Sequence, residues 1–113
     1  MFGCGGERDA GKRPLMGRIA EEHAEHVIIT NDNPRREDPR AIVADILRGL
    51  HTPGHALVEH DRRAAIRVAL RGANAEDAVL VAGKGHEDYQ LLGAQRIAFS
   101  DRDVVAELLD ELA

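Results

Sequence analysis

Apolar residues along this chain follow two different spacings. In four segments they recur three and four residues apart, the period of one face of a helix. These segments predict helices over residues 12–24, 41–50, 61–70 and 100–112. A short apolar run lies between each helix and the next, and these runs predict strands over residues 27–30, 55–59 and 78–82. Asp38, Asp61 and Ser100 stand where N-cap residues are expected, each directly before a helix.

The run 78–82 is apolar throughout, without alternation. Such a run is typical of a central parallel strand that is buried on both faces. Residues 95–99 follow a tight Gly93-Ala94 turn, which predicts an antiparallel strand. Alternation of strands and helices predicts an open, Rossmann-like α/β fold. We expect a mostly parallel sheet with helices on both faces and one antiparallel strand near the C-terminus.

Composition narrows the class of protein. The length of 113 residues suits one domain, residues 1–113. A net charge of −5 and only 3% aromatic residues argue against binding of nucleic acid. The chain has no apolar run long enough for a membrane span and no signal peptide. Its one cysteine, Cys4, cannot form an internal disulfide, so we expect a cytoplasmic protein.

Three polar loops carry the candidate chemistry: residues 3–13, 32–35 and 83–90. Each lies where a predicted strand ends, so we expect them to meet at the carboxyl edge of the sheet, where open α/β folds bind ligands. In the second loop, Pro34 stiffens the turn that presents Arg35. The Arg35 guanidinium can grip a carboxylate through two parallel hydrogen bonds. An ordinary polar turn is the alternative for this loop taken alone.

The first and third loops are ambiguous when each is taken alone. The first loop is glycine-rich but matches neither common phosphate-binding pattern, and its Arg8 and Arg13 are either anion ligands or solvated charges. In the third, Gly83 allows close backbone approach and Glu87 offers an acidic contact, or the segment is a tight turn that opens a helix. Together the loops offer guanidinium groups, a carboxylate and free carbonyls, which is what a zwitterionic amino acid requires.

Other candidates are weaker. His23 and His26 lack a third metal ligand and are expected at the surface. Cys4 has no evident partner and is expected to be a small buried residue. The arginines that follow Asp61 are expected to include a solvated helix face. We predict no metal site and no catalytic residue in this chain.

The residues of the three loops resemble those of a known family. Segments 2–16, 32–35 and 83–90 resemble the C-terminal domain of Mur ligases, in the branch that adds meso-diaminopimelate. The resemblance covers essentially the whole chain in order, and Asp-Asn-Pro-Arg is that branch's amino-acid recognition motif. It implies a part of an ATP-dependent ligase of peptidoglycan biosynthesis, which phosphorylates a D-glutamate carboxyl of its nucleotide precursor, UDP-MurNAc-L-Ala-D-Glu. The amine of diaminopimelate then attacks the acyl phosphate.

The resemblance also implies roles for individual residues. Arg8 and Arg35 would hold the distal carboxylate of meso-diaminopimelate. The recognition turn would consist of Arg35 together with Asp32, Asn33 and Pro34. The distal ammonium would be held by the Gly83 carbonyl and by Glu87.

The chain departs from the family pattern in what it lacks. The N-terminal UDP-binding domain and the central ATPase domain, which holds ATP and Mg²⁺ in the family, are absent from this sequence. The first strand and helix of the C-terminal domain are absent as well. We therefore expect the chain alone to be inactive and without cofactor, and to self-associate through an exposed sheet edge. The alternatives are a standalone module that binds a small molecule, and a structural fragment that binds nothing.

Overall fold

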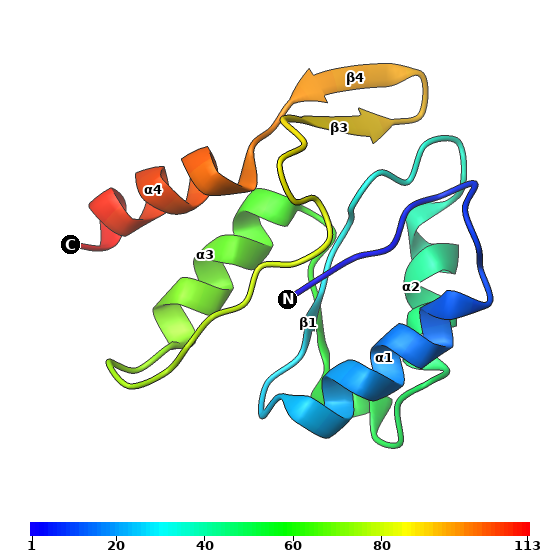
Figure 1. The fold of residues 1–113 in the computed structure, drawn as a ribbon, viewed down its shortest axis with the longest axis horizontal. Helices are drawn as coiled ribbons and strands as arrows, with labels where there is room; N and C mark the ends of the chain where they lie inside the picture. The colour runs from blue at the N-terminus through cyan, green and yellow to red at the C-terminus, as the bar shows by residue number, and fades with distance from the viewer.

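Two pairs of helices enclose a small central sheet in the computed structural model, which describes all 113 residues (Figure 1). Helices α1 and α2 lie on one side of β1, and α3 and α4 lie on the other. The mixed α/β class is as predicted. The elements in chain order are α1 (Lys12–His23), β1 (Ile28–Ile29), α2 (Pro39–Leu47), a 3₁₀ turn (Pro53–His55), β2 (Leu57–Val58), α3 (Arg62–Gly72), β3 (Tyr89–Leu92), β4 (Gln95–Ala98) and α4 (Asp101–Leu112).

Three helices begin at the predicted caps. The Asp38 carboxylate accepts a hydrogen bond from the backbone N–H of Arg40 at 2.9 Å. Asp61 and Ser100 do the same for α3 and α4, and each accepts from the N–H three residues further on. These bonds satisfy amide groups that have no partner inside the helix, which is why the sequence locates the helix starts so well.

Hydrogen bonds extend the parallel sheet beyond the two short strands β1 and β2. Phe2 pairs with Ile29 in parallel, and its N–H donates to the Ile28 carbonyl at 3.1 Å. On the other side of the first residues, the Ala82 N–H donates to the Met1 carbonyl at 3.0 Å. The extended segments therefore lie in the order 80–82, 1–2, β1, β2. The order along the sheet reverses between segments 80–82 and 1–2, and open α/β folds bind ligands at such a reversal.

The predicted central strand over residues 78–82 is wrong. Leu80 is 74% exposed and Val79 is 37% exposed, and the segment forms no regular strand. Its backbone pairs along one edge only, with Met1, and the Ala82 carbonyl also accepts from the Arg62 side chain. Only Val81 and Ala82 reach the two cores, because the helices and the neighbouring segment cover just the end of the run. An apolar run is buried only where elements cover both of its faces.

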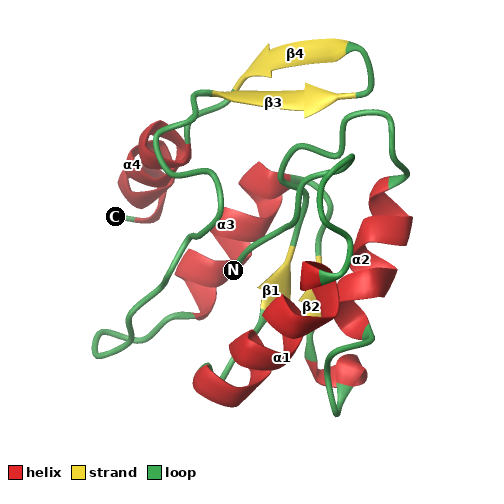
Figure 2. Ribbon diagram, turned by 45° about the vertical axis from the view of Figure 1, so that its right-hand side comes forward, coloured by secondary structure: helices red, strands yellow, loops and turns green.

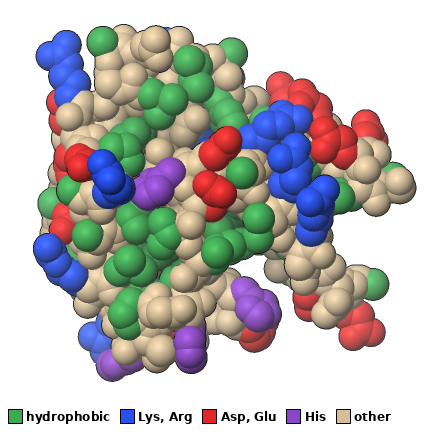
Figure 3. All heavy atoms as spheres, turned by 180° about the vertical axis from the view of Figure 1, so that it is seen from behind, with side chains coloured by type: hydrophobic (Ala, Val, Ile, Leu, Met, Phe, Trp, Pro, Cys, Tyr) green, Lys and Arg blue, Asp and Glu red, His purple; other side chains and the backbone are tan.

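Self-association through an exposed edge stays a prediction. The structure provides residues for it, because Leu57 and Val58 of β2 are exposed along the outer edge of the sheet. Figure 3 shows apolar side chains at the surface among the charged ones, on the face opposite to that of Figure 1. None of the helices has the length and hydropathy needed to cross a bilayer.

The helices form a separate core with each face of the sheet. The larger core lies under α1 and α2 and consists of Phe2, Cys4, Ile29, Ile42, Val43 and Ile46. A smaller core joins α3 to α4 through Ile66, Val104 and Leu108. Met1 packs on the smaller core and Phe2 belongs to the larger one, as expected for neighbours in an extended segment.

The hairpin β3–β4 is antiparallel, with Tyr89 opposite Ala98 and Leu92 opposite Gln95 (Figure 2). The second strand and its tight turn are as predicted, and Gly93 has the left-handed φ of +63° that such turns need. The hairpin is joined to the rest of the fold through Arg35, which pairs with Leu92. It therefore lies over the loops at the carboxyl edge of the parallel sheet.

Arg62 is a fully buried charged residue on the α3–α4 side of the sheet. Its Nε and Nη2 donate to the two oxygens of Asp101 at 2.8 Å each, and its side chain is 0% exposed. It also donates to the backbone carbonyls of Asn31 and Ala82. The expectation of a solvated arginine face holds for the other three arginines: Arg63 and Arg67 pair with acidic residues of α4 at the surface, and Arg71 is exposed.

A glycine determines how closely α1 approaches α2. A Cβ on Gly17 would overlap the backbone carbonyl of Ile46 and lie 2.7 Å from Leu50 Cδ1. We predict that Gly17→Ala destabilises the fold by about 1–3 kcal/mol, although alanine is the better helix former by about 1 kcal/mol. The matched control is Gly72→Ala in α3, where a Cβ meets nothing within 4 Å, so this change is neutral or stabilising. Urea unfolding measures both, and equal effects would contradict the packing argument.

Removal of the Arg62 side chain leaves Asp101 charged and buried without its partner. We predict that Arg62→Ala lowers the free energy of unfolding by about 3–5 kcal/mol. Arg71→Ala, at the exposed end of the same helix, is the control and changes it by less than about 0.5 kcal/mol. A loss under about 1 kcal/mol for Arg62→Ala, in urea or thermal unfolding, is incompatible with the role described.

Candidate functional site

The three predicted loops meet at the carboxyl edge of the parallel sheet. A Cβ on Gly83 would lie 3.1 Å from Asp32 Oδ2 and 3.6 Å from the Gly3 carbonyl, so the three loops are in contact there. Gly83 has a φ of +113°, which only glycine adopts readily. Gly6 has no room for a side chain either, because a Cβ would overlap the Pro34 carbonyl. The convergence that the sequence predicted is therefore present.

Arg35 is held by its backbone and retains free donors. Its φ is +55°, and its N–H and carbonyl bond to Leu91 and Gly93 of the hairpin at 3.0 and 2.6 Å. The guanidinium Nη1 donates to the carbonyls of Gly6 and Asn33 at 2.8 and 3.3 Å. Its Nε and Nη2 have no partner in the chain, and no carboxylate pairs with it. This half-buried guanidinium therefore presents an unused edge.

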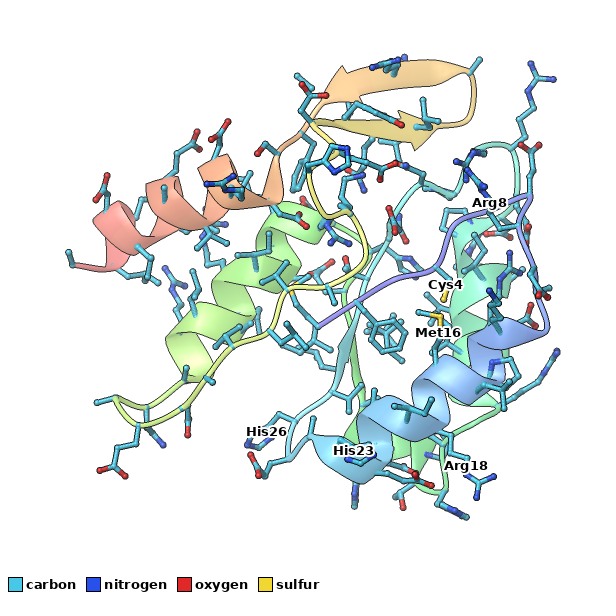
Figure 4. The ribbon with its side chains drawn as sticks, in the orientation of Figure 1. Cys4, Arg8, Met16, Arg18, His23 and His26 are labelled. Atoms are coloured by element: carbon cyan, nitrogen blue, oxygen red, sulfur yellow. The ribbon has the colours of Figure 1, made fainter.

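Arg8 lies beside Arg35. Arg8 Cγ and Arg35 Nη1 are 3.2 and 3.1 Å from the position that a Cβ on Gly5 would take. Arg8 is exposed on the first loop, and it too has no carboxylate partner within the chain (Figure 4). Two arginines thus approach one glycine, Arg35 with its guanidinium and Arg8 with its aliphatic stem, and neither has an acidic partner. Their positive charges suit an anion.

Asp32 and Asn33 are both buried beneath this surface. Burial raises the pKa of the Asp32 carboxyl, while the positive charges of Lys84 and Arg62 oppose the rise. The Asp32 carbonyl accepts from the Gln90 amide at 2.9 Å. The Asn33 side-chain oxygen accepts from the Leu91 N–H at 3.0 Å. The turn of residues 32–35 is thus hydrogen-bonded to β3 through Asp32, Asn33 and Arg35.

Lys84 is a residue of the site that the sequence analysis missed. It is 2% exposed, and its Nζ lies 3.1 Å from Asn33 Oδ1, 3.5 Å from Asp32 Oδ1 and 3.8 Å from Glu87 Oε1. It thereby joins the third loop to the second. A lysine between two glycines at the end of an apolar run was the only available signal, and it does not distinguish a buried amine from a solvated one.

Glu87 and Gly83 belong to the same loop as Lys84, and Gly83 approaches Asp32 directly. The Glu87 carboxylate is 32% exposed and accepts from the Tyr89 hydroxyl at 3.2 Å. The guanidinium of Arg96 stacks on the Tyr89 ring, 4.1 Å from its centroid. No hydrogen bond within the chain reaches the Gly83 carbonyl. An accessible carboxylate and a free carbonyl are acceptors suited to an ammonium group.

Arg13 is not a ligand residue, although the sequence left that reading open. It is 2% exposed and donates to both oxygens of Glu37 at 2.6 and 3.0 Å. It also donates to Asp45 and to the Gly5 carbonyl. Arg13 therefore holds the first loop against α2, and it supports the glycine around which Arg8 and Arg35 gather.

The remaining candidates lie outside the site. His23 and His26 are exposed at and just after the end of α1, on the opposite side of the domain from Arg8 (Figure 4). No group of three or more His, Cys, Asp or Glu side chains is placed to hold a metal ion. Cys4 is buried, its Sγ lies 3.6 Å from Met16 Sδ, and burial raises the pKa of its thiol.

Comparison with known proteins places these observations in a family. Residues 1–85 match the family described as "Mur ligase, glutamate ligase domain". A curated relative, UDP-N-acetylmuramoyl-L-alanyl-D-glutamate–2,6-diaminopimelate ligase of Vibrio vulnificus (strain YJ016), is 56% identical over 109 residues. The match covers 96% of this chain and 22% of that ligase. A solved structure of a ligase with the same name has a TM-score of 0.90 and 45% identity, over 98% of this chain and 24% of its own.

Two carboxyls near the site have pKa values shifted in opposite directions. Burial raises the pKa of Asp32, so its contribution to stability is full at low pH and is lost as pH rises through the raised pKa. The hydrogen bonds from Arg13 lower the pKa of Glu37, so its contribution is present above the ordinary pKa of a glutamate and is lost as pH falls through the lowered value. We predict that carboxyl ¹³C shifts show Asp32 titrating above its ordinary pKa and Glu37 below its own. The reverse order would contradict the structure.

Proposed function

The chain belongs to the Mur ligase family, and we propose that it is the amino-acid-binding domain of a ligase that adds meso-diaminopimelate to a nucleotide-linked peptide precursor. Since it spans only 22% of its curated relative, the activity of the whole ligase is part of this proposal. The domain would comprise residues 1–113. Its task would be to bind the incoming amino acid and to orient it.

The observation that carries the proposal is the unused edge of Arg35. An arginine that is half-buried, held by its backbone and without an acidic partner is organised for a ligand before the ligand arrives. Its Nε and Nη2 are spaced for the two oxygens of one carboxylate. Arg8, beside it, adds a second positive charge. These groups would hold the distal carboxylate of diaminopimelate, with Asp32, Asn33 and Pro34 forming the turn.

The acceptors around Gly83 support the other half of the proposal. The free carbonyl of Gly83 and the accessible carboxylate of Glu87 would receive the distal ammonium. A diamino diacid carries a carboxylate and an ammonium on the same distal carbon, so a site needs donors and acceptors side by side. Contact between the second and third loops provides that arrangement.

The nucleotide chemistry would be provided outside this chain. The sequence has no phosphate-loop pattern and no cluster of metal ligands, so its residues do not fit ATP or Mg²⁺. Both would be bound by the other domains of the ligase. What this chain would contribute is the position of the amine that attacks the activated carboxyl. A cytoplasmic location accords with the proposal, because Cys4 is a free thiol.

Removal of the Arg35 side chain tests the proposal directly. The test uses a ligase whose matching segment is replaced by this chain. We predict that Arg35→Ala lowers kcat/KM for diaminopimelate by an amount that corresponds to a loss of about 2–5 kcal/mol of transition-state stabilisation. Parameters for ATP and for the nucleotide substrate change far less, because those bind elsewhere. Steady-state kinetics with each substrate varied in turn measures this.

Two further variants provide the controls. Arg36→Ala removes the exposed neighbouring arginine and leaves kcat/KM unchanged within about threefold. Arg35→Lys restores little, because an ammonium cannot make two parallel bonds to a carboxylate. If Arg35→Ala leaves the preference for diaminopimelate over lysine within about tenfold of the unmodified enzyme, Arg35 does not recognise the distal carboxylate.

A further inference from the structure

Lys84 is a buried cation whose shortest contact is not with an acid. Its Nζ lies 3.1 Å from the amide oxygen of Asn33, whereas the two nearest carboxylates are 3.5 and 3.8 Å away. A buried ammonium usually sits against a carboxylate, because that contact best offsets the loss of hydration. Here the closest approach is made to a neutral side chain, the amide of Asn33.

The contact determines which end of the Asn33 amide faces inward. The amide oxygen accepts from Lys84 Nζ at 3.1 Å and from the Leu91 N–H at 3.0 Å. An ammonium and a backbone N–H can only donate, so a flipped amide would place its own NH₂ against two donors. The orientation of Asn33 is thus imposed by its neighbours, and its NH₂ group must face away from them.

The NH₂ group of Asn33 remains available. It has no hydrogen-bond partner within the chain. The only fully enclosed side-chain polar atoms without a partner are Arg13 Nε and Thr30 Oγ1, so the Asn33 nitrogen keeps access to the surroundings. Asn33 is otherwise buried and belongs to the same turn as Arg35, whose Nη1 donates to the Asn33 carbonyl. A free NH₂ can donate to a carboxylate and cannot accept from an ammonium.

We propose that Lys84 is a positioning residue that makes Asn33 a hydrogen-bond donor toward the distal carboxylate of the bound amino acid. This inference rests on the proposed function. Lys84 need not touch the ligand, and it acts through the orientation of one amide. Its charge also offsets the negative charge of Asp32, which would otherwise repel a carboxylate at the same turn. Discrimination against lysine would then depend on Lys84 as well as on Arg35.

The experiment is a titration of the ¹⁵N-labelled chain, followed by NMR, with meso-diaminopimelate and separately with L-lysine. In the unmodified chain, the side-chain NH₂ signals of Asn33 shift on addition of diaminopimelate and not of lysine. In Lys84→Met, which keeps the length of the side chain and removes its donor, diaminopimelate binds at least tenfold more weakly and the Asn33 NH₂ response is lost. Lys12→Met is the matched control, because Lys12 is the only other lysine and is exposed.

A second variant keeps the test valid if Lys84→Met does not fold. Asn33→Asp retains acceptors for Lys84 and Leu91 and replaces the free NH₂ by an oxygen. We expect diaminopimelate to bind at least tenfold more weakly to it, because an acceptor now faces the carboxylate. Binding within threefold of the unmodified chain, by either folded variant, would overturn the inference while leaving the proposed function intact. An unmodified chain that does not respond to diaminopimelate, in a concentration range that saturates the intact ligase, would overturn both.

Discussion

The buried guanidinium of Arg62 is the interaction on which the arrangement of this protein depends. One side chain of α3 binds the carboxylate of Asp101 at the start of α4 and also the carbonyls of Asn31 and Ala82. These partners come from segments far apart in the sequence, and they meet just below the three loops. Since a planar guanidinium donates in fixed directions, it sets the positions of all three segments relative to α3. The reversal in the order of the extended segments, and so the place where the loops converge, is stabilised by this group.

Arginines in this chain differ in how many of their donors are used. Arg62 and Arg13 are enclosed, and each binds one or two carboxylates together with backbone carbonyls. Arg13 links α1 to the first loop through the Gly5 carbonyl, and Arg62 links α3 to the start of the second loop through the Asn31 carbonyl. Arg35 uses one nitrogen for the same kind of structural contact and leaves the others free, and Arg8 uses none. The two arginines to which we assign ligand binding are therefore those that keep free donors, whereas Arg62 and Arg13 are engaged within the chain.

Local features were predictable from the sequence, and long-range burial was not. The caps at Asp38, Asp61 and Ser100 act within three residues, so a local pattern suffices to identify them. The convergence of the three loops follows from strand order, and a resemblance named their residues. The burial of Lys84 depends on Asp32, which is 52 positions away, and that of Arg62 depends on Asp101, 39 positions away. Residues 78–82 misled for the same reason, since an apolar run does not reveal whether neighbours cover it.

The hydrogen bonds between the turn of residues 32–35 and β3 have a consequence for protein engineering. Gln90 binds the Asp32 carbonyl, Leu91 binds the Asn33 side chain, and Leu92 pairs with Arg35. The four-residue turn and the first strand of the hairpin are consequently one unit of structure, despite the more than fifty residues between them. A graft of the turn alone into another domain would transfer the amino-acid sequence of the motif without its conformation. The transplantable unit is discontinuous, and it includes the strand that gives the turn its shape.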